Sequence, residues 1–63
     1  MKMQFQVIRD GDVIYYMDFP IDERWQLDEF SLVALTEFHK LHPDILLQDE
    51  DVIIKWSELQ ESD

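Results

Sequence analysis

Residues 3–19, MQFQVIRDGDVIYYMDF, carry the strongest structural signal in the chain. Apolar and polar side chains alternate in the run before Asp10-Gly11, and this period of two predicts a β-strand. An Asp-Gly dipeptide between two strand-like runs is a strong signal for a hairpin turn. We therefore predict two antiparallel strands, residues 3–8 and 12–19, with the only glycine of the chain at their turn.

The register of this hairpin is predicted from the segregation of its side chains. A two-residue loop would place Asp18 among the apolar side chains of the first strand. A loop of residues 9–11 segregates the two faces better, because a slip of one residue moves every side chain to the other face. We therefore favour that loop, with Gly11 in a left-handed bulge position. The apolar face then holds Met3, Phe5, Val7, Val13, Tyr15, Met17 and Phe19.

The second half of the chain predicts one helix and one more strand. A helix over residues 29–41 would begin after Asp28 as its N-cap, with Leu27 and Leu32 as a hydrophobic staple. Pro43 stops this helix. A strand over residues 52–56 follows, and the polar residues 57–63 are expected to fray. The apolar stripe of the helix consists of Leu27, Phe30, Ala34, Leu35, Phe38 and Leu41.

The order strand, strand, helix, strand predicts a two-layer α+β domain of ββαβ type over residues 1–63. One amphipathic helix would cover one face of a three-stranded, mainly antiparallel sheet. The direction of the last strand stays open, because it depends on the path of residues 43–51. A chain of 63 residues without cysteine has no disulfide, so aromatic packing or self-association has to support its small core.

The charge of the chain indicates the kind of partner it would bind. Fifteen acidic and five basic residues give a net charge of −10, although 46% of the residues are hydrophobic and favour a folded domain. Such a field repels nucleic acid and membranes and attracts basic surfaces. The absence of cysteine fits a reducing compartment, so we expect a cytoplasmic location.

Catalytic and metal-binding motifs are missing from the sequence. His39 and His42 lack the further ligands that a structural zinc ion needs. Residues 49–51 are acidic, but the loop pattern and glycine of a calcium site are absent. We therefore expect a protein that is not an enzyme and that binds no metal and no cofactor.

A protein-binding surface is the hypothesis that the sequence favours. Large apolar side chains on the sheet face away from the helix make a patch, and acidic residues would surround it. We expect this surface to bind a basic protein or to form a homodimer. The apolar strip consists of Ile8, Ile14, Tyr16 and Ile53. The acidic rim consists of Asp10, Asp12, Asp18, Asp22, Glu23, Asp49, Glu50 and Asp51.

In size, charge and architecture the chain resembles the small acidic inhibitors that bacteriophages and mobile elements encode, among them anti-restriction, anti-CRISPR and DNA-glycosylase inhibitor proteins. This resemblance implies an inhibitor that occupies the basic surface of a nucleic-acid-binding protein by imitating the dense negative charge of DNA. The alternative is an antitoxin-like or regulatory partner subunit that neutralises a basic protein without such mimicry. In its order of elements the chain also resembles partial ribonuclease-H-like antitoxin domains.

Overall fold

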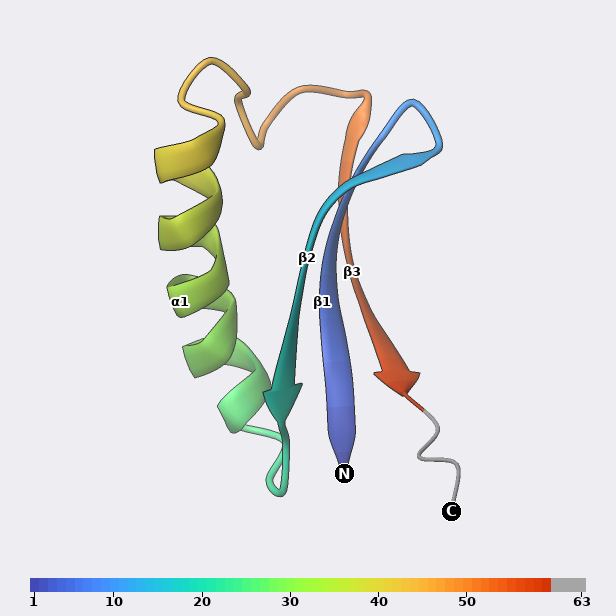
Figure 1. Cartoon of the computed structure of the whole chain (residues 1–63), viewed down its shortest axis with the longest axis vertical. Coiled ribbons are helices and arrows are strands. Elements are labelled where there is room, and N and C mark those ends of the chain that lie inside the picture. The colour runs from blue at the N-terminus through green and yellow to red at the C-terminus, as the bar shows by residue number, and fades with distance from the viewer. Residues whose placement is uncertain (60–63) are drawn as a thin grey trace.

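The computed structural model of the chain describes residues 1–59. It contains strands β1 (Lys2–Arg9) and β2 (Asp12–Pro20), helix α1 (Gln26–Leu41) and strand β3 (Val52–Leu59). The sheet has the order β2-β1-β3, and β1 pairs antiparallel with both neighbours (Figure 1). The predicted ββαβ order is thus confirmed, and the direction of the last strand, which the sequence left open, is antiparallel.

The turn of the β1–β2 hairpin has two residues, so the predicted three-residue loop is wrong. Arg9 pairs with Asp12, and the residues between them, Asp10 and Gly11, have φ angles of 51° and 82°. Two consecutive residues with positive φ are the signature of a type I′ turn. The twist of this turn matches the twist of the paired strands, and Asp-Gly is one of the dipeptides that best accept positive φ at both positions.

A β-bulge restores the faces that the sequence predicts for most of the hairpin. The register shifts between Val7 and Ile8, because Ile14 is an extra residue on β2. On the side of the bulge away from the turn, Phe5 pairs with Met17, and the two side chains share the face that contains the core. The bulge therefore allows a tight turn and a segregated sheet in the same hairpin.

Val13 and Ile14 exchange the faces that the sequence predicts for them. Val13 pairs with Ile8 on the outer face and is 50% exposed. Ile14 is half-buried and packs against the core, because a bulge re-aims the side chain at its own position. The assignment of Ile14 to the outer apolar strip is therefore wrong, and Val13 takes its place.

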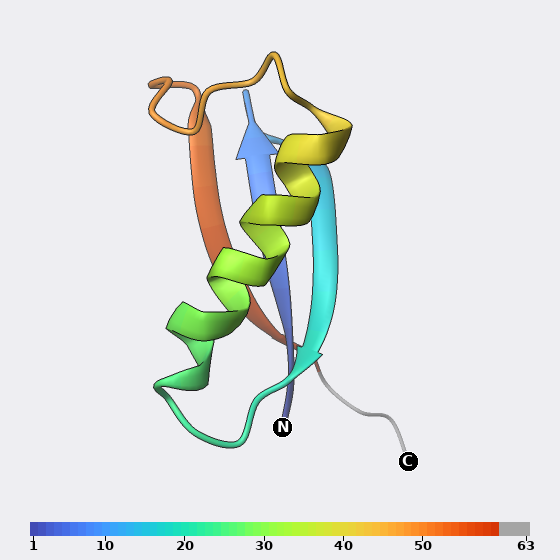
Figure 2. The same ribbon diagram turned by 90° about the vertical axis from the view of Figure 1, so that its left-hand side faces the viewer.

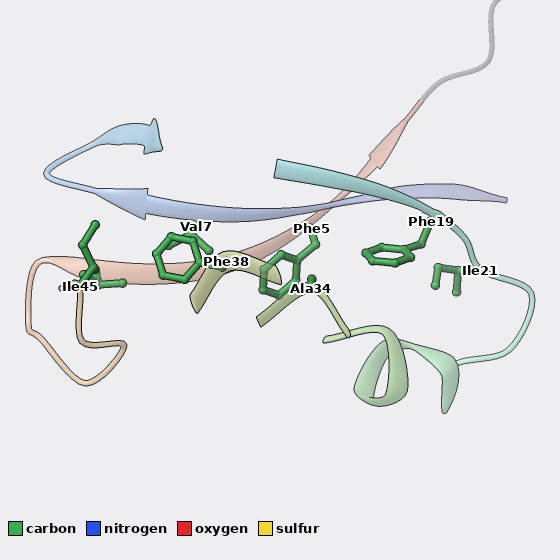
Figure 3. Close-up of a cluster of buried hydrophobic side chains, with 8 residues drawn as sticks. Phe5, Val7, Phe19, Ile21, Ala34, Phe38 and Ile45 are labelled. Carbon is green, nitrogen blue, oxygen red and sulfur yellow. The ribbon is translucent and has the colours of Figure 1, made fainter. Parts of the chain in front are cut away.

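Helix α1 crosses one face of the sheet diagonally (Figure 2). The Trp56 Nε1 atom of β3 donates a hydrogen bond to Ser31 Oγ at 3.1 Å. Further along the helix, the Phe38 ring lies 5.5 Å from the Tyr15 ring of β2, in an edge-to-face arrangement. Near its start the helix thus contacts β3, and it also contacts β2 through the Phe30 ring, which stacks on Phe19 at 4.7 Å; toward its end it contacts β2. The buried core consists of Phe5, Val7, Phe19, Ile21, Ala34, Phe38, Ile45 and Val52 (Figure 3).

The helix begins at Gln26, earlier than the predicted residue 29. Trp25 is the N-cap residue and makes no side-chain capping bond, so Asp28 lies in the first turn and its predicted role as N-cap is wrong. Gln26 Oε1 instead accepts hydrogen bonds from the backbone N–H groups of Asp22, at 2.7 Å, and Glu23, at 2.9 Å. These bonds fix the loop that leads into the helix.

Two apolar helix residues lie outside the core. Leu32 is 69% exposed, so the predicted staple with Leu27 does not form. Leu41 is 65% exposed, although the predicted stripe includes it. A helix that crosses a sheet diagonally leaves the sheet near its end, and this explains the exposure of Leu41.

Strand β3 is longer than predicted. It continues to Leu59, which pairs with Lys2, so residues 57–59 belong to the sheet and the prediction that they fray is wrong. Residues 60–63 of the predicted tail lie outside the described residues. Ile53 and Lys55 lie on the outer face as predicted, because they pair with residues of β1 that face away from the core.

Candidate interaction surface

The outer face of the sheet, turned away from α1, carries three aliphatic side chains in one row. Ile8 on the central strand pairs with Val13 on β2 and with Ile53 on β3. Ile53 is 59% exposed, Val13 is 50% exposed and Ile8 is half-buried. Because paired side chains on one face lie within contact distance, the three form a continuous strip. We call Ile8, Val13 and Ile53 the outer apolar row.

Tyr16 extends this apolar surface along β2. It pairs with Gln6 on the same face and is 63% exposed. Tyrosine combines a large apolar ring with a polar hydroxyl, and it is enriched at the centres of protein interfaces. Tyr16 and the outer apolar row together therefore have the composition of a binding surface.

Five acidic residues gather at the end of the sheet beside this row. The Asp10 N–H donates a hydrogen bond of 3.1 Å to the Asp51 carbonyl, which joins the β1–β2 turn to the turn before β3. Figure 1 shows these two turns side by side at the top of the sheet. The Val52 N–H donates to the Asp49 carbonyl at 3.1 Å, which fixes the second turn. We call Asp10, Asp12, Asp49, Glu50 and Asp51 the acidic end.

Arg9 is the basic residue that lies within the acidic end. Its Nε atom is 3.3 Å from Asp51 Oδ2, and both side chains are more than a third exposed. Among residues 1–59, Asp10, Asp12 and Glu50 form no ion pair. One guanidinium therefore leaves most of the negative charge of the acidic end available to a basic surface.

The other three acids of the predicted rim lie elsewhere. Asp18 is on the outer face, where its Oδ1 atom accepts a hydrogen bond of 3.0 Å from Gln4 Nε2. Asp22 and Glu23 lie in the β2–α1 loop, at the opposite end of a molecule 37 Å long (Figure 1). Asp22 Oδ1 is 3.9 Å from the N-terminal amine. The structure thus brings five of the eight predicted acids together and separates the rest.

Val13 is the surface residue that sequence reasoning assigns wrongly. Alternation alone predicts it on the core face, and no sequence feature marks the bulge at Ile14. The one available signal was the two-residue reading of Asp10-Gly11, which pairs Arg9 with Asp12 and Ile8 with Val13, as observed. The two-residue register is correct for the turn and for the pair of Ile8 with Val13, and it is wrong for the residues of β2 that follow Val13.

Comparisons of the chain with protein-family models, with curated proteins and with solved structures find no match. Within residues 1–59, no three His, Asp or Glu side chains come together in a way that could hold a metal ion. The helix in this part of the chain is too short and too polar to cross a membrane. The functional interpretation therefore rests on the geometry and charge of the residues themselves.

Proposed function

We propose that the protein is a small acidic binding module that inhibits a basic partner protein by covering its nucleic-acid-binding surface. The observation that carries this proposal is the position of the acidic end directly next to the outer apolar row. Asp12 precedes Val13 directly, and the Asp10–Asp51 bond lies two residues from the Ile8–Ile53 pair. An apolar centre beside a charged rim is the usual composition of a protein interface.

The two parts of this surface have different roles in the proposed complex. The carboxylates of the acidic end attract a basic surface, raise the rate of association and fix its orientation. The outer apolar row and Tyr16 lose water on contact and supply the lasting affinity. A partner that fits both parts has exposed lysine or arginine side chains next to an apolar patch.

A nucleic-acid-binding protein is the partner class that this charge favours. Arginine and lysine side chains that bind phosphates also bind carboxylates with charge-assisted hydrogen bonds. A dense group of exposed carboxylates therefore competes with DNA or RNA for the same surface, which is the principle of a DNA mimic. We propose a non-enzymatic role in the cytoplasm, in line with the resemblance in size and charge to phage-encoded and mobile-element inhibitors.

A pair of charge-matched variants tests the contact. Asp10→Asn/Asp12→Asn/Glu50→Gln removes three charges from the acidic end, and asparagine suits the positive φ at position 10. The control Asp22→Asn/Glu23→Gln/Asp28→Asn removes three charges near the opposite end of the molecule. Tagged forms of the two triple variants and of the unchanged chain are used to capture partners from a lysate of the cells in which the protein naturally occurs. We expect the first variant to bind the captured partner about tenfold more weakly or worse, and the control to bind as the unchanged chain does.

Competition with DNA tests the kind of inhibition. With the captured partner purified, we expect duplex DNA and the protein to exclude each other, and added salt to weaken the complex. A basic partner that binds both at once would instead support the antitoxin-like or regulatory role without mimicry. Equal loss of binding in the two triple variants, or no loss in either, would refute the assignment of the acidic end as the contact.

A further inference from the structure

The two edges of the sheet differ in their protection against a further strand. Strand β2 contains the bulge at Ile14 and ends at Pro20, which has no N–H group to donate. Strand β3 has eight residues, pairs without any register shift and contains no proline. Natural edge strands are usually blunted by bulges, prolines or charges, and β3 has only Lys55 and Glu58 for this purpose.

The hydrogen-bond pattern shows which backbone groups of β3 are free to pair. The bond from Asp10 to Asp51 makes these residues a hydrogen-bonded pair of the β1–β3 ladder. Hydrogen-bonded and non-hydrogen-bonded pairs alternate along an antiparallel ladder. The N–H and C=O groups of Ile54, Trp56 and Glu58 therefore point away from β1, and no strand among residues 1–59 pairs with them.

We propose that a second copy of the chain binds along this edge, β3 against β3 in antiparallel orientation. The contact would join two three-stranded sheets into one six-stranded sheet around a two-fold axis. Because that axis is perpendicular to the sheet, both helices would cover the same face. This inference is independent of the proposed function, which uses the outer face and the acidic end.

Charge and composition favour a second copy over a basic partner at this edge. Lys55 and Glu58 cancel, so β3 is neutral within a chain of net charge −10. A basic partner is attracted to the acidic end, whereas two copies meet with the least repulsion along a neutral strand. Ile54 lies on the helix side of β3 and is nevertheless 42% exposed, so pairing would cover an apolar side chain beside the free edge.

Amide hydrogen exchange of the unchanged chain, followed by NMR, tests the proposal directly. Amides at the dimer contact exchange from the monomer. If the dimer predominates, the monomer fraction falls in inverse proportion to the square root of the protein concentration, so a twentyfold increase in protein concentration should slow this exchange about fourfold. We expect this slowing at the outward amides of Ile54, Trp56 and Glu58. The outward amides of Tyr16 and Asp18 on β2 should exchange fast at every concentration. Unprotected β3 amides at about 1 mM protein would overturn the proposal.

Two proline variants provide the matched test. Ile54→Pro removes an outward N–H from β3, and Asp18→Pro removes an outward N–H from β2, so neither removes a ladder bond to β1. In sedimentation equilibrium we expect the first variant to be monomeric and the second to dimerise as the unchanged chain does. Dimerisation of Ile54→Pro, or loss of the dimer in Asp18→Pro alone, would refute the β3 contact.

Salt separates this proposal from the function proposed above. Two copies of charge −10 repel each other, so added salt should strengthen the dimer, whereas it should weaken binding to a basic partner. A monomer that still binds its basic partner would refute only the dimer. A dimer without affinity for basic proteins would refute only the proposed function.

Discussion

Replacing Phe38 by alanine tests how α1 docks on the sheet. The Phe38 side chain is fully buried and contacts the ring of Tyr15. Removing a buried phenylalanine side chain costs about 3–5 kcal/mol, and the better helix propensity of alanine returns about 0.5 kcal/mol of this. Folded domains have about 0.05–0.15 kcal/mol of stability per residue, so this chain has about 3–9 kcal/mol in total. The net loss of about 2.5–4.5 kcal/mol should therefore remove a quarter of the stability or more.

Urea denaturation followed by circular dichroism measures this loss. With a slope of roughly 1–3 kcal/mol per M of urea, the midpoint should fall by about 1 M or more. Leu41→Ala is the control, because Leu41 is in the same helix but is 65% exposed, and it should change stability by no more than about 0.5 kcal/mol. If Leu41→Ala destabilises the protein as much as Phe38→Ala, α1 presents a different face to the sheet and the reasoning is refuted.

The turn and the half-buried Tyr15 give two further predictions. Gly11 has a φ of 82°, and an added Cβ atom would meet nothing within 4 Å, so Gly11→Ala should cost only backbone strain of about 1 kcal/mol in urea denaturation. An unchanged midpoint would contradict the left-handed turn. Burial, assisted by the negative charge of Glu37, raises the pKa of Tyr15 above its ordinary value of 10.0. The unfolded chain then loses this proton first, so stability should fall as the pH rises above about 10, and Tyr15→Phe should reduce that fall. If the unchanged chain and Tyr15→Phe lost equal stability between about pH 9 and about pH 11, the raised pKa of Tyr15 would not be the cause.

The features that the sequence predicts correctly depend on local periodicity. Met3, Phe5 and Met17 share a face because alternation is a property of each strand by itself. The same reasoning assigns Ile53 and Lys55 to the outer face of β3 before its partner strand is known. Element order and the end of the helix are predicted for the same reason, since both follow from short patterns.

The features that the sequence does not predict depend on contacts that no periodicity and no capping pattern encodes. The start of α1 at Gln26 is fixed by hydrogen bonds that its Oε1 atom accepts from backbone N–H groups of the preceding loop, and no capping pattern indicates them. Leu41 has the spacing of a core residue, but the diagonal path of the helix leaves it exposed. In the predicted acidic rim, nothing in the sequence separates Asp22 from Asp10, and only the fold places the loop of Asp22 and the turn of Asp10 at opposite ends.

The bulge at Ile14 connects the two contacts proposed for this molecule. With a two-residue turn and no bulge, Asp18 would lie on the core face, at the cost of burying a charge. Because of the bulge, the residues of β2 after Ile14 change register, and Asp18 lies on the outer face instead. Between the turn and the bulge the register is still that of the two-residue turn, which keeps Val13 on the outer face, next to Asp12 of the acidic end. The bulge also interrupts the edge of β2, which leaves β3 as the regular edge of the sheet. One extra residue on β2 is thus compatible with both proposals: the apolar row lies next to the acidic end, where we propose a basic partner, and β3 remains the regular edge, where we propose a second copy.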